Sequence, residues 1–322
     1  MSRTITFSKN VFLPLTNVCA NACGYCSFKG PVVDGCVMPE SEVMSLLYRG
    51  SAFGCTEALF TFGECPEKVP GFLRYIEAIG YSDILSYCEA MSRVAIDLGM
   101  LPHTNAGILS YDELARLRHV NVSMGLMLET TAILPAHCRS PGKDPSVRLE
   151  MIADAGKLHI PFTTGLLLGI GETSDDRESS LAEIRDLHKR YGHIQEVIIQ
   201  NFCPKNGTEM AGVPGASLEV ICEALQLAVE ILPKDVSIQI PPNLSNVGSL
   251  LHLGVTDIGG ISPVTIDYIN PEHPWPSLDV LNEITGYKLQ ERLCVYPQYC
   301  NAKWISPELL PLVERLMKRV YG

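Results

Sequence analysis

Three cysteines lie close together just after the first apolar segment of the chain, in the stretch VCANACGYCSF. Cys19, Cys23 and Cys26 are separated by three residues and then by two. A structural zinc site needs four ligands, usually with a second pair of cysteines or histidines downstream, and the sequence offers no such pair. A fully ligated iron–sulfur cluster also takes four thiolates. Three thiolates in one tight loop therefore favour a cubane cluster whose fourth iron is open to a ligand from outside the protein.

The composition limits the kinds of protein to which this loop can belong. The chain has 322 residues, of which 46% are hydrophobic, enough for a sizeable core. A net charge of −11 argues against a nucleic-acid partner, because phosphate binding needs clustered Lys and Arg. No apolar run reaches the length of a membrane span, and the first residues lack the apolar core of a signal peptide. We therefore expect a cytoplasmic protein without a membrane partner, whose twelve cysteines are metal ligands or buried thiols and not disulfides.

An alternating set of elements must position the cysteine loop. Strand-like apolar segments alternate with helical patterns, which predicts a TIM-barrel-like (β/α)8 barrel in a single domain, residues 1–322. Residues 254–322 would close and extend this barrel. An open doubly wound sheet is the main alternative for such an alternation. The last strand-like segment is glycine-rich and could be a loop, so a partial six-stranded barrel is a second alternative. The strand candidates cover residues 10–16, 58–64, 100–105, 121–130, 162–172, 196–202, 237–243 and 253–261.

Helical patterns fill the intervals and carry recognisable end signals. Ser110 is a predicted N-cap with Glu113 as its capping-box partner, and Gly156 is a predicted C-cap. The helical patterns cover residues 39–50, 110–120, 144–156, 175–192 and 217–232. In a barrel of this kind the chemistry lies at the carboxyl ends of the strands. Polar candidates at those ends are Asn17, Glu64, Asn105, Glu129, Glu172, Asn201, Asn243 and Asp257.

The segment CANACGYC resembles the C-x3-C-x-aromatic-C signature of the radical S-adenosylmethionine (SAM) superfamily. In that superfamily three cysteines bind a 4Fe–4S cluster, and the amino and carboxylate groups of SAM chelate the open iron. An electron from the cluster then cleaves SAM and gives a 5′-deoxyadenosyl radical. The resemblance implies that Cys19, Cys23 and Cys26 bind the cluster and that Tyr25 packs near the adenine.

Further motifs follow in the order that such a fold requires. TFGE resembles the motif that holds the SAM amino group, with Gly63 and Glu64 in place and Phe62 where that motif has its first glycine. Glu129 resembles the acidic residue on strand four that contacts SAM. Arg148 resembles the arginine that pairs with the SAM carboxylate, a contact suited to a guanidinium. The strand-five motif against which the adenine lies is matched by Gly169, Ile170 and Gly171.

Longer blocks narrow the resemblance to one family and cover nearly the whole chain. FSKNVFLPLTNVCANACGYCSF, HCRSPGKDPSVRLEMI and GGISPVTIDYINPEHPWP look like the small subunit of 7,8-didemethyl-8-hydroxy-5-deazariboflavin synthase. The resemblance implies hydrogen abstraction from 5-amino-5-(4-hydroxybenzyl)-6-(D-ribitylimino)-5,6-dihydrouracil, followed by ring closure and loss of ammonia. Such an enzyme is a radical SAM carbon–nitrogen lyase, and its product FO is the chromophore precursor of coenzyme F420.

The same resemblance implies partners and a substrate site. The partners are the large radical SAM subunit, which makes the adduct, and a low-potential electron donor. His103 is a candidate base for ring closure because histidine titrates near neutrality; a structural strand-end histidine is the alternative. A ribityl chain and a pyrimidinedione need many neutral hydrogen-bonding groups. Candidate substrate-binding residues at strand ends are Asn105, Gln200, Asn201, Gln239 and Asn243.

Two other functions fit parts of the sequence. The first is another radical SAM cyclase, such as an enzyme of the futalosine route to menaquinone. The second is an electron-transfer or binding protein that uses the cluster passively, which would predict a fourth nearby thiolate. The chain also departs from the family pattern at Cys65, Cys203 and Ile258, where the family has a basic residue, an arginine and a tryptophan. These departures concern substrate contacts more than SAM chemistry.

Overall fold

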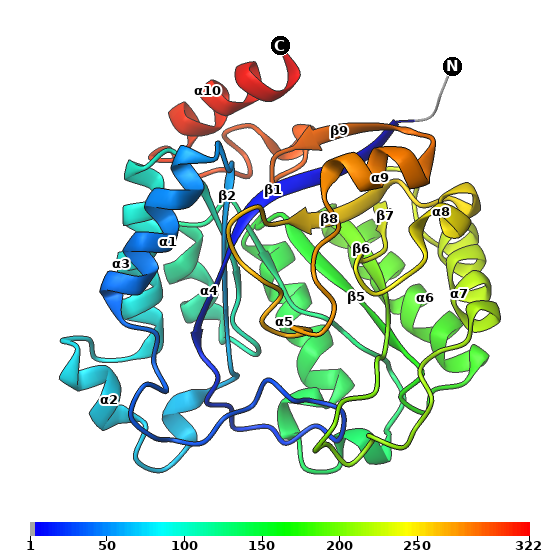
Figure 1. Ribbon diagram of the computed structural model, residues 1–322, viewed down its shortest axis with the longest axis horizontal. Helices are drawn as coiled ribbons and strands as arrows, with labels where there is room; N and C mark the ends of the chain where they lie inside the picture. The colour runs from blue at the N-terminus through cyan, green and yellow to red at the C-terminus, as the bar shows by residue number, and fades with distance from the viewer. Residues whose placement is uncertain (1–3) are drawn as a thin grey trace.

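A closed barrel of parallel strands forms the centre of the molecule in the computed structural model, which describes residues 4–322. Within those residues β1 to β8 follow one another around the barrel, because β8 pairs with β1 and β1 pairs with β2 (Figure 1). The strands are β1 (Thr4–Thr16), β2 (Glu57–Phe62), β3 (Leu101–Asn105), β4 (Ser123–Gly125), β5 (Phe162–Leu168), β6 (Ile194–Asn201), β7 (Ser237–Gln239), β8 (Asp257–Ile261) and β9 (Lys288–Arg292). The prediction of a (β/α)8 barrel is confirmed, and neither the six-stranded barrel nor the open sheet is formed.

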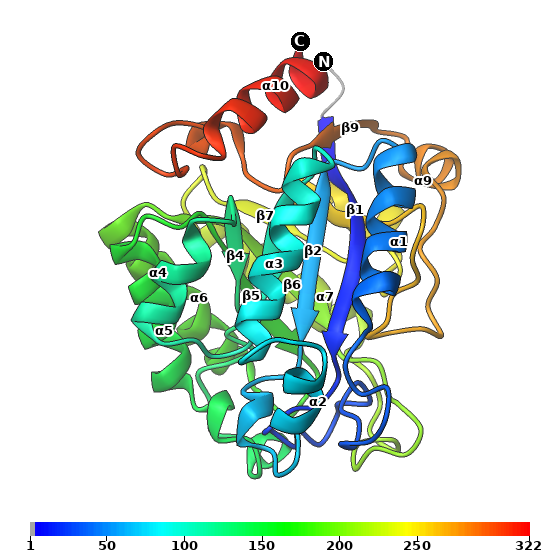
Figure 2. The same ribbon diagram turned by 90° about the vertical axis from the view of Figure 1, so that its left-hand side faces the viewer.

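Helices cover the outside of the barrel between successive strands (Figures 1 and 2). None of the helices within residues 4–322 combines the length and the apolar character needed to cross a membrane. The helices are α1 (Glu40–Ala52), α2 (Leu73–Ala78), α3 (Ile84–Asp97), α4 (Tyr111–Arg118), α5 (Pro145–Lys157), α6 (Ser174–Tyr191), α7 (Leu218–Ile231), α8 (Val247–Leu250), α9 (Leu278–Thr285) and α10 (Leu310–Tyr321).

The glycine-rich eighth strand is part of the barrel for a packing reason. β8 pairs with β1 on one side and with β7 on the other. A Cβ atom at Gly260 would collide with the side-chain amide of Asn10, and one at Gly259 would collide with the amide of Gln239. Gly259 also has a φ of 75°, which favours glycine. The two glycines therefore make room for two amide side chains inside the barrel.

The fourth strand is shorter than the sequence pattern predicts. β4 ends at Gly125, although the apolar segment continues to residue 130. Glu129 has a φ of 67°, so the backbone leaves the extended conformation there. Its amide still donates to the carbonyl of Gly165 at 2.9 Å, which keeps this segment beside β5. Glu129 is therefore held at the carboxyl end of the barrel by backbone contacts as well as by its side chain.

The amino end of the barrel is covered by a ninth strand and the C-terminal helix. The sequence pattern did not indicate either element. β9 pairs in parallel with the first half of β1. Figures 1 and 2 show β9 and α10 at the opposite end from the loop that follows β1. Buried apolar residues join this C-terminal segment to β3, namely Leu101, Val122, Trp304, Val313 and Leu316 among others. One end of the barrel is thus covered, and the other end carries the loops.

The predicted helix ends give one success and one error. α4 begins after Ser110, whose side chain accepts a hydrogen bond from the amide of Glu113, while the Glu113 side chain accepts from the amide of Ser110 at 2.7 Å. The prediction of Gly156 as a C-cap is wrong, because α5 continues through Lys157. A Cβ atom at Gly156 would collide with the ring of Tyr191. This glycine lets α5 and α6 pack closely and does not end the helix.

Candidate active site

The cysteine loop lies at the carboxyl end of the barrel and is fixed by backbone hydrogen bonds. The amide of Ala20 donates to the carbonyl of Glu64 at 2.8 Å, next to the end of β2. The amides of Ala22 and Gly24 donate to the carbonyls of Arg139 and Ala136, at 3.1 and 2.8 Å. The loop therefore rests on the segments that follow β2 and β4, as the strand-end rule for barrels predicts.

Two of the three thiols accept hydrogen bonds from neighbouring segments. The amide of Glu64 lies 3.3 Å from the Sγ atom of Cys19, and the hydroxyl of Ser140 lies 3.2 Å from that of Cys23. Burial raises the pKa of the Cys19 thiol, and the backbone amides of Asn21 and Glu64 oppose that shift. Donors aimed at sulfur stabilise a thiolate, which is the form that binds iron.

An outer cavity of about 380 Å³ lies beside this loop, and all three cysteines line it. Within residues 4–322, no group of three or more His, Cys, Asp or Glu side chains is arranged around a single metal ion. A cubane does not require such convergence, because each of its thiolates binds a different iron. Three cysteines on one wall of a cavity that can hold a further ligand therefore fit a 4Fe–4S cluster with an open iron.

Gly63 and Glu64 connect the end of β2 to the cysteine loop. A Cβ atom at Gly63 would collide with the carbonyl of Val18, directly before Cys19, so only glycine permits this approach. The Glu64 carboxylate accepts a hydrogen bond from the side-chain amide of Asn21 at 2.7 Å. It also lies 3.4 Å from the guanidinium of Arg148. Both predicted residues are thus at the cavity, and Glu64 is held by the cysteine loop itself.

Glu129 and Arg148 are buried beside the same cavity. Burial acts to raise the pKa of Glu129, but the ion pair with Lys143 and the charge of Arg148 lower it below its ordinary value. Arg148 donates to the carbonyl of Gly142 at 2.9 Å and to that of Met127. All four side chains line the cavity: Glu64, Glu129, Lys143 and Arg148. The structure therefore brings together two carboxylates and two cations next to the three thiols.

Tyr25 is half-buried and contacts the rings of two other side chains, His137 and Phe202. Its hydroxyl lies 3.1 Å from Nε2 of His137, and its ring centroid lies 6.4 Å from that of Phe202. Burial raises the pKa of Tyr25 well above its ordinary value, and burial also lowers the pKa of His137 to about 4. Both groups are therefore neutral at pH 7. Tyr25 lines the outer cavity, and its packing near the adenine stays a prediction.

None of the three predicted strand-five residues lines the outer cavity. Leu167 lines it, whereas Gly169, Ile170 and Gly171 do not. The amides of Gly169 and Ile170 donate to the carboxylate of Glu172 at 2.9 Å. Ile170 packs in the apolar cluster that also contains Phe202 and contacts Tyr25. These residues support the cavity wall, and their contact with the adenine stays a prediction.

A deeper cavity of about 200 Å³ lies inside the barrel and shares wall residues with the outer one. The shared residues include Phe12, Asn105, Thr163, Ile198 and Gln200. Gln239 and Asn243 line only the deeper cavity, and Asn201 lines only the outer one. All five predicted substrate residues therefore line one cavity or both.

His103 lies on the wall of the deeper cavity, not beside the cysteines. Its Nδ1 lies 2.7 Å from the hydroxyl of Ser123, and its Nε2 lies 3.2 Å from the side-chain oxygen of Asn105. Burial lowers the pKa of His103 to about 4, so the ring is neutral at pH 7. This placement is compatible with both roles predicted for His103. A neutral ring can accept a proton as the base for ring closure, and it can also orient Asn105 as a structural histidine.

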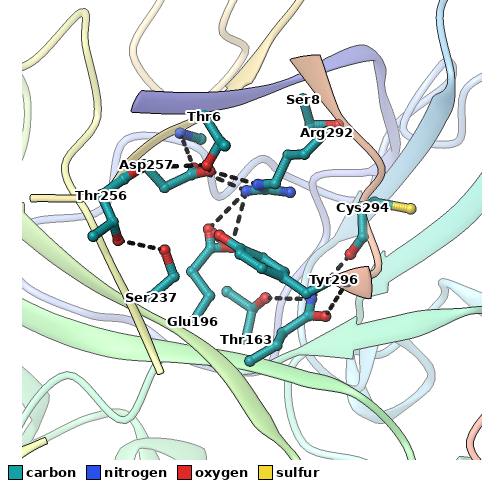
Figure 3. Close-up of polar contacts among 12 residues, drawn as sticks. Thr6, Ser8, Thr163, Glu196, Ser237, Thr256, Asp257, Arg292, Cys294 and Tyr296 are labelled. Carbon is teal, nitrogen blue, oxygen red and sulfur yellow. Dashed lines mark hydrogen bonds and ion pairs between the residues drawn. The ribbon is translucent and has the colours of Figure 1, made fainter. Parts of the chain in front are cut away.

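A buried ionic cluster of Glu57, Glu196, Asp257 and Arg292 lies at the floor of the deeper cavity, and all of these residues except Asp257 line that cavity. Figure 3 shows how Glu196, Asp257 and Arg292 meet. Arg292 of β9 donates to both carboxylate oxygens of Asp257, at 2.5 and 2.9 Å, and to Glu196 at 2.9 Å. Burial raises the pKa of Glu196; Arg292 opposes this, but the charges of Asp257 and Glu57 add to it, so the net shift is upward. The sequence predicted Asp257 at the carboxyl end of its strand, and that placement is wrong, because Asp257 begins β8 at the amino end. The cluster as a whole was missed, because its four charged residues come from four strands that are far apart in the sequence.

Other residues that sequence reasoning missed lie inside the quoted blocks. Asn21 is within the cysteine motif, and Ser140 and Lys143 are within HCRSPGKDPSVRLEMI. Their position in blocks that resemble the family indicated a functional role, although no spacing rule predicted which residues they contact. Of the three departures, Cys203 lines the outer cavity and Ile258 the deeper one, whereas Cys65 lines neither.

Comparison with known proteins identifies the family. A model of the radical SAM superfamily matches residues 13–184, just over half of the chain. The chain is 60% identical to 7,8-didemethyl-8-hydroxy-5-deazariboflavin synthase of Methanoregula boonei over 319 residues, which cover 99% of this chain and 97% of that one. It is 62% identical to the synthase of the same name from Methanoculleus marisnigri over 319 residues, which cover 99% and 96%.

Solved structures confirm the architecture. Methylornithine synthase (PylB) superposes with a TM-score of 0.65 at 16% identity, over 89% of this chain and 83% of that one. The FeFe-hydrogenase maturase HydG from Carboxydothermus hydrogenoformans superposes with a TM-score of 0.70 at 17% identity, over 98% and 79%. At such low identity these likenesses concern the fold alone. The chain thus belongs to the radical SAM superfamily, with its 4Fe–4S cluster and SAM, and within it to the family of 7,8-didemethyl-8-hydroxy-5-deazariboflavin synthases.

Proposed function

We propose that this chain, a radical SAM enzyme that makes FO in coenzyme F420 biosynthesis, does so as an ammonia-releasing carbon–nitrogen lyase. Its substrate is 5-amino-5-(4-hydroxybenzyl)-6-(D-ribitylimino)-5,6-dihydrouracil. Hydrogen abstraction from this adduct is followed by closure of the deazaflavin ring, loss of the amino group as ammonia, and loss of one further electron and one proton. The substrate is thus oxidised by two electrons, and SAM, cleaved to 5′-deoxyadenosine and methionine, is the net oxidant. When bound, the cluster and SAM supply the electron and the 5′-deoxyadenosyl radical that takes the hydrogen atom.

The single observation that carries this proposal is the pair of connected cavities. One has the three cysteines on its wall, and the other is lined by amides and carboxyl groups. Their shared wall contains Asn105 and Gln200, which are neutral hydrogen-bonding groups suited to a pyrimidinedione. A substrate that spans both cavities places its reacting carbon between the cysteine wall and the barrel interior. Enclosure there excludes water and other hydrogen donors.

The residues around the outer cavity have distinct roles in this proposal. Cys19, Cys23 and Cys26 hold the cluster. Glu64 accepts hydrogen bonds from the SAM amino group, Glu129 binds the cofactor through its carboxylate, and Arg148 pairs with the SAM carboxylate. Backbone at Gly63 and the apolar surface of Tyr25 complete this site. The strand-five segment Gly169, Ile170 and Gly171 backs the adenine.

His103 acts in this proposal as the base for ring closure. It is neutral at pH 7, and it lies on the wall of the substrate cavity, next to Asn105. A base of this kind takes the proton that is released when the new bond forms. Asn105, Gln200, Asn201, Gln239 and Asn243 bind the substrate's polar groups.

The partners in this proposal are the large radical SAM subunit, which supplies the adduct, and a low-potential electron donor. We place the reaction in the cytoplasm. We also propose that residues 1–322 form one domain that is closed and extended by residues 254–322. The apolar cluster shared by β3 and the C-terminal segment supports that view.

The test of the lyase assignment is a balance of products. The anaerobically reconstituted enzyme, supplied with SAM, a reductant and the adduct, should release one ammonia for each FO formed. FO without ammonia would contradict the proposed step. The futalosine-route alternative predicts no deazaflavin from this adduct, and a passive cluster protein predicts no 5′-deoxyadenosine.

A further inference from the structure

We propose that the deeper cavity is a polyol site, which binds the ribityl chain of the substrate and keeps it away from the cysteine wall. This inference rests on the proposed function, because it assigns one part of that substrate to one part of the barrel. The cysteines, Glu64 and Arg148 line the outer cavity and not the deeper one. The two cavities therefore divide the site into a SAM end and a second end whose ligand must be polar.

Polar atoms without hydrogen-bond partners indicate which kind of ligand the deeper cavity binds. The side-chain oxygens of Asn10 and Asn243 and the indole Nε1 of Trp275 are buried, and none has a hydrogen-bond partner among the described residues. All three residues line the deeper cavity. Buried polar groups without partners are uncommon and costly in native proteins, unless a ligand satisfies them. The ligand must therefore donate to two oxygens and accept from one N–H group.

The floor of the cavity adds charged partners. Glu57, Glu196 and Arg292 line it together with the three unpartnered groups. A chain of hydroxyl groups matches this lining, because each hydroxyl donates one hydrogen bond and accepts others. Asn10 and Gln239 occupy space that Gly260 and Gly259 leave free in β8. The two glycines of β8 therefore matter for binding, because larger residues at these positions would displace the side-chain amides of Asn10 and Gln239 from the cavity wall.

The other parts of the substrate fit this cavity less well. A hydroxybenzyl group is mainly apolar and has one hydroxyl, so it would leave most of these groups without partners. The pyrimidinedione must remain near the reacting carbon, at the wall that the two cavities share. The chemistry also favours separation, because C–H bonds next to hydroxyl groups readily lose hydrogen atoms to carbon radicals. A ribityl chain at the floor is removed from the 5′-deoxyadenosyl radical formed at the cysteine end.

Binding of FO tests this inference without turnover. The anaerobically reconstituted enzyme is titrated with FO and with a synthetic analogue that carries a pentyl chain in place of ribityl, and deazaflavin fluorescence gives each Kd. The test variants are Asn10→Leu and Trp275→Phe, which remove an unpartnered polar atom and break no hydrogen bond identified for that atom. Thr61→Val is the matched control, because the Thr61 hydroxyl is also buried and unpartnered but lines only the outer cavity.

The inference predicts a selective loss. Each test variant should weaken FO binding about three- to tenfold and leave the Kd of the pentyl analogue unchanged, and Thr61→Val should leave the ratio of the two values unchanged. Equal weakening of both ligands, or no change in the ratio for both test variants, would overturn the inference. If Asn10→Leu does not fold, Trp275→Phe decides. If the selective loss is found but the enzyme makes no FO from the adduct, the polyol site stands and the proposed reaction fails.

Discussion

Charged side chains are buried at both ends of the barrel, but they are held in different ways. At the carboxyl end, Glu64 and Arg148 lie beside a cavity, their ion pair is 3.4 Å long, and the arginine also bonds to backbone carbonyls of loops. At the amino end, Arg292 of β9 and Asp257 of β8, two strands that both pair with β1, share a bidentate contact at 2.5 and 2.9 Å. Contacts at the carboxyl end can be exchanged for contacts to a ligand. Those at the amino end fix the strands of the barrel.

This difference separates function from stability along the barrel axis. Substitutions at the carboxyl end should change cofactor binding and turnover more than folding. Substitutions at the amino end should change folding first. His103 lies between these two regions, because it lines the deeper cavity and its ring contacts Asn105 on the wall that the two cavities share.

The largest functional effect is expected at the carboxyl end. Cys23→Ala should remove a cluster ligand, so that the anaerobically reconstituted protein loses its oxygen-sensitive cluster and all formation of 5′-deoxyadenosine. Its urea unfolding midpoint should change little. Iron and sulfide analysis measures the loss of the cluster. Cys138→Ala, at an exposed cysteine outside both cavities, is the control and should keep its iron. Unchanged iron content in Cys23→Ala would contradict the assignment.

The largest effect on stability is expected at the amino end. Arg292→Met would leave Asp257 and Glu196 buried without their cation, which should cost about 3–5 kcal/mol of unfolding free energy. Arg116→Met is the control, since its pairs with Glu89 and Asp83 are partly exposed and should contribute no more than about 1 kcal/mol. Urea unfolding measures both. Equal losses in the two variants would show that the floor is no more important than a surface ion pair.

His103 tests the boundary between the two ends. If His103 is the base for ring closure, His103→Gln should lower the rate of FO formation about 100-fold, while 5′-deoxyadenosine is still released. Because the pKa of His103 is about 4, its titration should give no inflection in the rate between pH 6 and 8. His188→Gln, on α6 outside both cavities, is the matched control. A loss of only a few-fold would assign His103 a structural role.

The smallest effect concerns the Lys143–Glu129 pair. The pKa of Glu129 lies below its ordinary value in the folded protein, so the pair stabilises the fold above that value, and the stabilisation is lost as the pH falls through the lowered pKa. Lys143→Met should therefore cost about 2 kcal/mol at pH 7 and less at pH 4.

Urea unfolding at the two pH values checks this prediction. Lys157→Met, which removes an exposed pair with Asp154, serves as its control and should change stability far less, because solvent screens that pair. A cost in Lys143→Met that does not depend on pH would show that the lysine acts through packing and not through its charge.

Local patterns predicted the parts of the fold that local physics determines. The eight barrel strands and the capping box at Ser110 each depend on residues a few positions apart. The cysteine loop, Gly63 and Glu64 were also found, because a motif encodes them in a short segment. Each of these features therefore leaves a readable pattern in the sequence.

The remaining features depend on contacts between distant segments. Gly156 looked like a helix end because nothing in the sequence shows that Tyr191 packs against it. β9 is short and polar and has strand structure through its pairing with β1. The floor cluster joins residues from β2, β6, β8 and β9, so no spacing rule could assemble it. The fold class and the placement of the three cysteines at one cavity were thus within reach of the sequence, whereas the ionic cluster at the floor and the shape of the cavities were not.

One assay tests most directly whether the two ends of the site work together. The anaerobically reconstituted protein is incubated with SAM, a reductant and the adduct, and 5′-deoxyadenosine and fluorescent deazaflavin are measured in the same samples. The account predicts that both products form and that each depends on the presence of Cys23. Formation of 5′-deoxyadenosine without deazaflavin would contradict it, because the outer cavity would then act on SAM while the barrel interior failed to present this substrate.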